Sequence, residues 1–197
     1  KKISIGAELS FFKTKEAWLI TFMTALGTGG GFAWLSYIAP LMTENAGVQE
    51  SFMMYIMILV GLGMVIGNLI GGRLADRVAP VKACMIIFLI IAANLMTFFL
   101  FSEVKWLALL LCFTCGASFL ALASPIQLLM LRTAKDAEMI SAGVTQASFN
   151  IGNSLGAYLG GLILMLGYGF QFPSLAGFFL ALIGFALAFT FYRVADT

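Results

Sequence analysis

Six long apolar runs, separated by short polar or charged segments, constrain this chain more than any other feature. No Asp, Glu, Lys or Arg lies well inside any of them, and they cover residues of about 17–40, 52–72, 83–101, 106–131, 139–166 and 174–192. A helix of about 20 residues, rising about 1.5 Å per residue, crosses a hydrocarbon core of roughly 30 Å. With 61% hydrophobic and 10% charged residues, the chain is too apolar for an ordinary soluble domain. The pattern predicts an all-α membrane protein with six transmembrane helices.

The charged residues sort onto two sides of this arrangement. Ten of the eleven Lys and Arg residues fall on one side, whereas the other side carries one Lys and three Glu, which are Lys105, Glu44, Glu50 and Glu103. The positive-inside rule then predicts that both termini are cytoplasmic. We expect three segments, which are a cytoplasmic linker at the membrane surface (1–16), the six-helix bundle (17–192) and a cytoplasmic tail (193–197).

Several classes of function lack support in the composition. The chain has no histidine, which removes His-based metal sites and Ser-His-Asp or Cys-His catalysis. Its three cysteines lie inside apolar runs and are predicted to be packing residues. No basic cluster is interleaved with exposed aromatics, as nucleic-acid binding would need. We therefore expect no enzyme activity, no cofactor, no metal and no nucleic-acid partner.

The chain also has features of an excerpt with internal symmetry. It starts at Lys1 rather than Met, and no signal-peptide pattern precedes the first run, so we expect a piece of a longer protein. The first three runs span 85 residues (17 to 101) and the last three span 87 (106 to 192). Because three is odd, the second triplet starts from the opposite side, as in the inverted repeats of transporter halves. Six helices alone are also common among unrelated membrane proteins.

Two runs carry small residues at every fourth position. One set is Gly63, Gly67 and Gly71, and the other is Ser148, Gly152, Gly156 and Gly160. Such a smooth ridge lets another backbone approach closely where lipid provides no hydrophobic drive for association. The ridges either pack statically against a neighbouring helix or let one helix slide against another.

The fifth run also carries a polar face. Gln146, Asn150 and Asn153 are spaced by four and three, so they share one face, turned away from the glycines. Amides in hydrocarbon are costly unless they have partners, so this face should look into a cavity or against another helix. Substrate contact and interhelical hydrogen bonding explain it about equally well. Further candidates for lining a cavity are polar side chains of the first and fourth runs, namely Thr21, Thr24, Thr28, Ser118, Ser124 and Gln127.

Two positions are predicted to interrupt helices. The stretch 29–31 is Gly-Gly-Gly, and each Gly costs a helix interior roughly 1 kcal/mol relative to Ala, so a bend or an unwound turn is expected there. Pro125 favours a kink in the fourth run. Trp34 and Tyr37, on the outer half of the first run, either close a cavity or sit in the interfacial aromatic belt, and the belt is the favoured position.

A charged stretch at 72–82 joins the second and third runs. Gly72 allows tight packing or turning at a helix end, Asp76 can accept hydrogen bonds from the N–H groups of a neighbouring helix N-terminus, and Arg77 and Lys82 can meet phosphates or acidic residues. A contact of this kind contributes about 0.3–1 kcal/mol, the size expected of a latch that must open. The alternative is a solvated loop whose basic residues only set topology.

These residues resemble motifs of the major facilitator superfamily. The stretch 72–77, Gly-Arg-Leu-Ala-Asp-Arg, resembles the family loop G-x-L-a-D-R-x-G-R-R between the second and third helices of each half. Residues 79–81 depart from that pattern, and Lys82 follows it. The fifth run is similar to the family's antiporter signature, with Ala157 in place of a proline and with glycines at Gly143, Gly152, Gly156, Gly160 and Gly161.

The resemblance covers nearly the whole chain as the C-terminal six-helix half, and the chain looks like the arabinose-efflux or drug-proton antiporter branch. It implies alternating-access transport of a small sugar- or drug-like molecule, with proton-coupled efflux across a bacterial-type plasma membrane. It also implies that the first, second, fourth and fifth helices border the cavity, which adds Asn68 to the candidates, whereas Asn94 and Thr97 in the third are structural. The implied partners are the substrate, the N-terminal six-helix half, the lipid bilayer and a proton. Because no carboxylate lies mid-membrane here, the missing half would bind that proton. The competing hypothesis is a non-transporting six-span scaffold or assembly subunit that binds another membrane protein through its glycine ridges.

Overall fold

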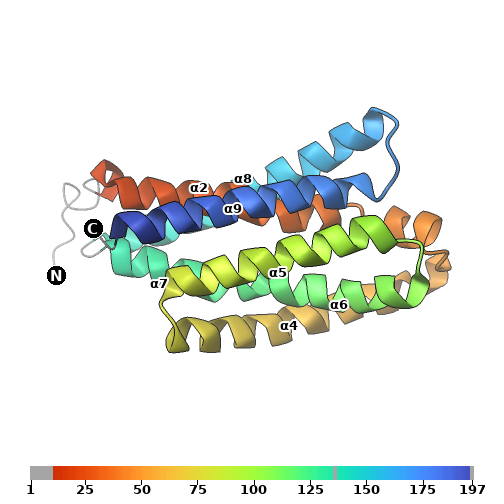
Figure 1. Cartoon of the computed structure of the whole chain (residues 1–197), viewed down its shortest axis with the longest axis horizontal. Helices are drawn as coiled ribbons and strands as arrows, with labels where there is room; N and C mark the ends of the chain where they lie inside the picture. The colour runs from red at the N-terminus through yellow and green to blue at the C-terminus, as the bar shows by residue number, and fades with distance from the viewer. Residues whose placement is uncertain (1–10, 135–136, 196–197) are drawn as a thin grey trace.

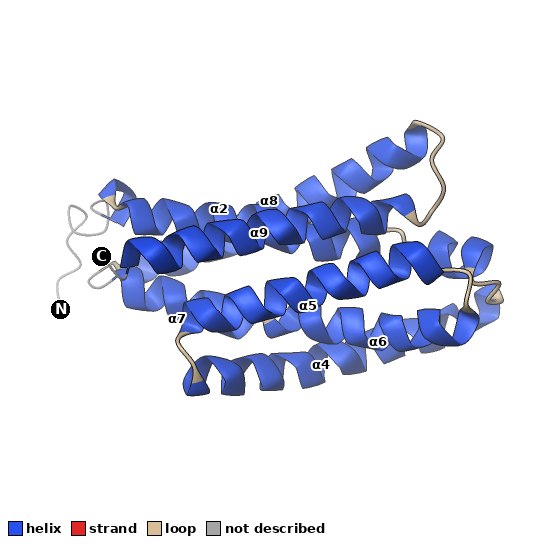
Figure 2. Cartoon of the chain, in the orientation of Figure 1, coloured by secondary structure: helices blue, strands red, loops and turns tan. Residues whose placement is uncertain are grey.

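A computed structural model describes residues 11–134 and 137–195, and all regular structure within these ranges is helical (Figure 2). The long helices lie side by side along one direction (Figure 1), and they are α2 (Lys15–Leu35), α4 (Met53–Arg77), α5 (Pro80–Phe101), α6 (Lys105–Ala121), α7 (Ala123–Ala134), α8 (Glu138–Met165) and α9 (Phe172–Ala195). Short helical segments are η1 (Phe11–Lys13), α3 (Ile38–Pro40), η2 (Leu41–Asn45) and η3 (Glu50–Phe52). The predicted all-α fold is therefore confirmed for the described residues.

Most of these helices have the length and composition of membrane spans. Within the described residues, four segments are long and apolar enough, namely Glu50–Arg77, Pro80–Phe101, Lys105–Ala134 and Phe172–Val194. A fifth is added if Lys15–Leu35 and Ile38–Asn45, which meet at a bend of 47°, count as one span. The α8 helix has 28 residues, which is long enough to cross a membrane. Its three amides lower its hydropathy, however, and it is not among the segments that are apolar enough. The structure thus supports four or five of the six predicted spans, and α8 as the sixth stays a prediction.

The basic residues gather at one end of the bundle. Figure 1 shows the beginning of α2, the α4–α5 turn, the end of α7 and the end of α9 at the same end. The helix ends and the turn that meet there carry Lys13, Lys15, Arg73, Arg77, Lys82, Arg132 and Arg193, whereas Lys105 begins α6 at the opposite end. Lys1, Lys2 and Lys135, together with most of the predicted linker, lie outside the described residues. The predicted separation of charge is present, and the side of the membrane that each end faces stays a prediction.

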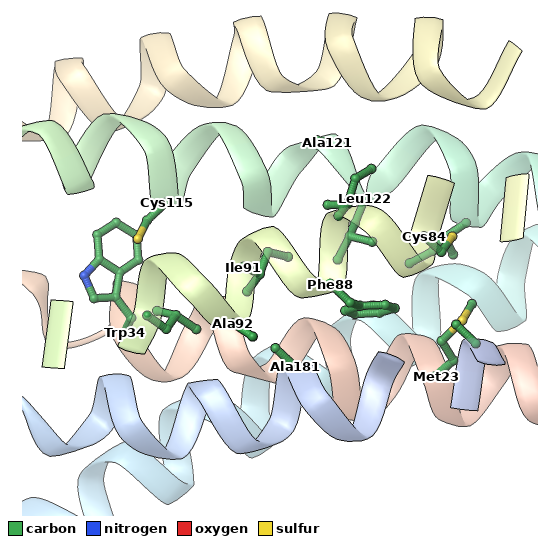
Figure 3. Packing of buried hydrophobic residues seen from close by; sticks show 14 of the residues in the cluster. Met23, Trp34, Cys84, Phe88, Ile91, Ala92, Cys115, Ala121, Leu122 and Ala181 are labelled. Atoms are coloured by element: carbon green, nitrogen blue, oxygen red, sulfur yellow. The ribbon is translucent and has the colours of Figure 1, made fainter. Parts of the chain in front are cut away.

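The interior of the bundle is filled by large apolar side chains. Trp34 is 1% exposed and packs on Phe98 with ring centroids 5.8 Å apart, and Figure 3 shows it inside the bundle close to Cys115. The prediction of an interfacial belt position was therefore wrong for Trp34, because its place in the chain does not reveal the long-range contact with α5. All three cysteines are free and buried, as predicted for packing residues.

The three consecutive glycines do not interrupt their helix. The α2 helix continues through residues 29–31 to Leu35, and the bend follows at Ser36–Tyr37. Each glycine lies against a neighbouring element, and a methyl group at Gly30 would come within 2.5 Å of the Gly177 carbonyl oxygen of α9. A bend was predicted near these glycines, and it occurs a few residues beyond them. The glycines themselves stay helical, because close packing of α2 against its neighbours outweighs their low helix propensity.

The fourth apolar run is interrupted as predicted. The α6 helix ends at Ala121 and α7 begins at Ala123. Pro125 lacks the N–H that would otherwise donate to the carbonyl oxygen of Ala121 four residues earlier, so the helical hydrogen bonding breaks one turn before the proline.

Asn45 joins three connecting segments at the end of the bundle opposite the termini. Its Nδ2 donates to Ser102 Oγ, 3.2 Å away in the α5–α6 connection, and to Gln171 Oε1, 2.9 Å away in the α8–α9 connection. Asn45→Ala is expected to lower the free energy of unfolding by about 1–2 kcal/mol, since it removes two hydrogen bonds at a half-buried site. The melting temperature of the complete protein measures this loss.

Thr43→Ala is the matched control for Asn45→Ala. The Thr43 hydroxyl donates to Ala39 O one turn back in the chain, at 3.1 Å, so its loss does not separate the connecting segments. Equal shifts in melting temperature for both variants would show that Asn45 does not tie these segments together.

Candidate functional site

The two glycine ridges form two helix interfaces of the same kind. The ridge of α4 packs on α6, because added methyl groups at Gly63, Gly67 and Gly71 would collide with the backbone of Phe113, Ala117 and Ala121, in that order. The ridge of α8 packs on α2, because a methyl at Gly152 would lie 2.6 Å from Ala25 O and one at Gly156 would collide with Gly29 O. In both interfaces only hydrogen atoms separate the backbones, which is the close approach that small residues allow in membranes.

Tyr37 closes the end of the α2–α8 interface that lies away from the basic end of the bundle. Its hydroxyl donates to the Ala157 carbonyl oxygen of α8 at 2.8 Å. A methyl group added at Gly160 would lie 2.5 Å from the Tyr37 ring, and one added at Gly161 would lie 2.5 Å from the Tyr37 hydroxyl oxygen. Sequence reasoning favoured the interfacial belt for Tyr37 and did not predict this contact with α8. The signal that could have found it is the pair Gly160 and Gly161, which leaves room for an aromatic ring from the neighbouring helix. Gly143, by contrast, has open space around it and makes no close helix contact within the described residues.

Two predicted amides, Gln127 and Gln146, meet at a cavity between α7 and α8. The cavity has a volume of about 330 Å³, and it is lined by Gln127, Met130, Leu131, Ser141, Ala142, Thr145 and Gln146. Both amide side chains are exposed at the surface of the bundle. Sequence reasoning missed Ser141 and Met130, although Ser141 and Thr145 stand one turn apart on α8, next to the predicted amide face.

The other two amides of α8 lie further along the helix. Asn150 is exposed, and Asn153 is half-buried. The Oδ1 atom of Asn153 is buried and has no hydrogen-bond partner among the described residues. An unpaired amide oxygen in such a place is costly. Because this oxygen is covered by the bundle itself, Asn153 does not offer it to a substrate at the surface.

A second polar pair joins α4 to α7. Ser124 Oγ donates to Asn68 Oδ1 at 3.0 Å, and Asn68 is exposed. A methyl group added at Gly72 would lie 3.7 Å from Ser124 Oγ, so Gly72 and Asn68 both face Ser124. Ser124 directly precedes Pro125, so this pair stands next to the helix interruption.

The remaining candidates lie within the bundle. Thr24 and Thr28 are fully buried and donate to Ile20 O and Thr24 O, each at 2.7 Å, whereas half-buried Thr21 donates to Ala17 O at 2.8 Å. Ser118 is 7% exposed and accepts from Asn94 Nδ2 at 3.1 Å. The buried side chains of Thr24 and Thr28 therefore stand inside the bundle, not on a surface that another half could complete into a cavity. Ser118 lies at a groove between α4, α5 and α6 and not at the cavity between α7 and α8.

The charged stretch at 72–82 is mostly helical. The α4 helix extends to Arg77 and α5 begins with Pro80, so the turn is Val78 and Ala79 alone. Gly72 therefore lies inside α4, and its predicted place at a helix end was wrong, because the basic and acidic residues after it continue the helix.

The predicted latch residues Asp76, Arg77 and Lys82 differ in their surroundings. Asp76 and Arg77 are exposed, and no hydrogen bond or ion pair joins Asp76 to another described residue. The Lys82 ammonium lies 5.2 Å from the centroid of the Tyr192 ring of α9, a cation–π contact that holds this side chain against the bundle. Any partner of Asp76 therefore has to come from outside the described residues.

Comparison with known proteins identifies the family. The model of the Major Facilitator Superfamily matches residues 17–197. "Putative transporter AraJ" of Escherichia coli (strain K12) is 39% identical over 186 residues, which are 94% of this chain and 46% of that protein. "Inner membrane transport protein YdhP" of the same strain is 30% identical over 94% of this chain and 47% of its own length. "Probable sugar efflux transporter" of Pasteurella multocida (strain Pm70) is 26% identical over 84% of this chain and 40% of its own length.

Two conclusions follow from these matches. The chain spans about half the length of the curated relatives that it matches. The family model and a relative 39% identical both extend over nearly the whole chain. The chain is thus a member of the Major Facilitator Superfamily, an integral membrane protein of a family of transporters.

Proposed function

We propose that this chain is the C-terminal six-helix half of a secondary active transporter that exports a small, uncharged organic molecule by alternating access. An N-terminal six-helix half completes the substrate path and supplies the carboxylate for proton coupling. Both termini of the chain lie in the cytoplasm, at the basic end of the bundle, and the membrane is a bacterial-type inner membrane. Membership of the family and the half-length match to its relatives support this proposal.

The cavity between α7 and α8 carries the proposal. Its lining contains two amides and two hydroxyl groups and no charged side chain among the described residues. An uncharged polar lining with apolar walls suits a neutral molecule that bears hydroxyl or amide groups. The name of the Pasteurella multocida relative, a sugar efflux transporter, fits such a substrate. An amphipathic drug-like molecule is the alternative, and Met130 in the lining would accommodate it.

The two interfaces formed by the glycine ridges support the proposed inverted repeat and the proposed tilting of the bundle during transport. In two inverted triplets, the first span corresponds to the fourth and the second corresponds to the fifth. The contact of α2 with α8 joins the first and fifth spans, and the contact of α4 with α6 joins the second and fourth. An inverted repeat would therefore relate the α2–α8 interface to the α4–α6 interface by symmetry. Both interfaces are indeed built on glycine ridges. Smooth ridges of this kind allow small helix displacements within the bundle while it tilts as a whole.

Transport by a Gln146→Ala variant tests the proposal. We expect the KM of the complete protein for its substrate to rise by about fivefold to tenfold, because a hydrogen bond to an uncharged group contributes about 1 kcal/mol and its loss leaves substrate groups unpaired. Initial rates in proteoliposomes with a labelled sugar and a labelled amphipathic drug measure the change and separate the two substrate classes.

Ser154→Ala is the control for Gln146→Ala, since Ser154 is an exposed polar residue of the same helix outside the cavity lining. An unchanged KM for Gln146→Ala would remove this cavity from the mechanism. Absence of transport for every substrate, together with a stable complex with another membrane protein, would favour the six-span scaffold.

A further inference from the structure

A second groove, distinct from the polar cavity, lies between α4, α5 and α6. Its volume is about 290 Å³, and its walls are mainly aliphatic, with Ile70 and Leu74 from α4 and Ile87 and Ile90 from α5. Ile70 is 55% exposed and Ile90 is 47% exposed, so the groove opens to the surface of the bundle. Because α4 and α5 are both long and apolar enough to cross a membrane, the groove lies at the depth of the bilayer.

The groove extends from near the α4–α5 turn to about the middle of the membrane. On α4 its lining runs from Leu74 back to Gly67, and on α5 it runs from Ile87 to Asn94. At about 1.5 Å per residue, Gly67 lies about 15 Å from Arg77 along the helix, which is half of a hydrocarbon core of roughly 30 Å. The lining itself, from Gly67 to Leu74 and from Ile87 to Asn94, is about 10 Å long, so the groove covers the deeper two-thirds of one leaflet.

The amide nitrogen at the deep end of the groove already has its partners. Asn94 Nδ2 donates to the carbonyl oxygen of Thr114 at 3.2 Å and to Ser118 Oγ at 3.1 Å. An amide nitrogen carries two N–H donors, and both are used within the bundle. A hydrocarbon chain beside Asn94 would therefore leave no amide donor unpaired.

Two arginines stand at the other end of the groove. Ile70, Leu74 and Arg77 are spaced by four and three, so they share one face of α4, and Arg73 is adjacent to that face. Both arginines are exposed. A guanidinium group binds phosphate oxygens in a bidentate manner, more specifically than an ammonium group does.

We propose that this groove binds an anionic phospholipid, with an acyl chain between α4 and α5 and its phosphate held by Arg73 and Arg77. The cationic mouth complements the charge of the head group, and the aliphatic walls complement a chain of one leaflet. Inorganic phosphate would leave the apolar groove unfilled. A zwitterionic phospholipid also carries a phosphate, but its head-group ammonium would be repelled by the two arginines. This site is independent of substrate transport and requires only that α4 and α5 span the membrane.

Photo-cross-linking of lipid to the complete protein tests the proposal. The protein is placed in nanodiscs of phosphatidylcholine with a minor fraction of phosphatidylglycerol that carries a diazirine in its acyl chain. We expect the cross-links to fall on the groove segments of α4 and α5. Ile90→Trp fills the groove and should remove most of them. Leu89→Trp should keep them, because Leu89 is 46% exposed, against 47% for Ile90, but lies outside the groove lining.

The head-group contact is tested by Arg73→Gln, with Arg132→Gln, an exposed arginine of α7 at the same end of the bundle, as control. Arg73→Gln should lower phosphatidylglycerol cross-linking about fivefold and leave cross-linking of a phosphatidylcholine probe unchanged. Equal labelling of Ile90→Trp and Leu89→Trp would mean that only unspecific surrounding lipid was detected. A disulfide from Ile70→Cys to a cysteine in the other half, with no lipid label on α4 or α5, would mean that protein covers the groove. Either result would overturn the proposal.

Discussion

Gly67→Leu is expected to prevent α4 and α6 from packing. A Cβ atom at this position would overlap the carbonyl oxygen of Ala117, and a backbone atom in a helix cannot turn aside as a side chain can. The two helices would have to separate along the whole ridge from Gly63 to Gly71. Overpacking of this kind costs about 3 kcal/mol or more. We therefore expect a strong drop in melting temperature and in the monodisperse fraction of the purified complete protein.

Gly61→Leu is the matched control, because it makes the same chemical change in the same helix. Nothing lies within 4 Å of a Cβ atom placed at Gly61. Leu also has a higher helix propensity than Gly, so the melting temperature of this variant should stay the same or rise slightly. Equal losses for Gly61→Leu and Gly67→Leu would show that the ridge is not a packing surface.

Asp76→Asn is expected to reduce transport by the complete protein about tenfold. The carboxylate is exposed at the end of α4, and we expect its partner to be the N-terminus of a helix outside the described residues. A carboxylate at a helix N-terminus contributes about 0.3–2 kcal/mol, and about 1.4 kcal/mol corresponds to a factor of ten in an equilibrium. Without the charge, the conformation closed at the basic end is less populated. Initial transport rates in proteoliposomes measure the effect.

Glu103→Gln provides the control for Asp76→Asn. Glu103 is an exposed acidic residue in the α5–α6 connection at the opposite end of the bundle, so its neutralisation should leave the rate unchanged. Equal rates for wild type and Asp76→Asn would remove the latch from the mechanism.

Features that depend on local pattern could be predicted from the sequence. The apolar runs are sufficient to place α4, α5 and α9, because helix length and hydropathy are set by neighbouring residues. The ridge of α4 followed from glycine spacing, since every fourth residue of a helix returns to one face. The interruption before Pro125 followed from its missing N–H.

Features that depend on distant contacts could not be predicted. The glycines at 29–31 stay helical because α8 and α9 pack against them, and Trp34 is buried because α5 lies next to it. Among the candidate polar residues, spacing alone could not separate Thr24 and Thr28, which are buried within the bundle, from Gln127 and Gln146, which meet at a cavity. That difference depends on which helices become neighbours, and the sequence of one helix does not contain this information.

The reaction of a Gln146→Cys variant with a membrane-impermeant thiol reagent is the most direct test of the account. Background labelling from this chain should be low, because Cys84, Cys112 and Cys115 are all buried. If α8 borders a substrate path between two halves, the new thiol reacts from water, and bound substrate slows the reaction. A thiol that stays unreactive with and without substrate, in protein that still transports, would show that this face of α8 packs against protein or lipid and would contradict the account.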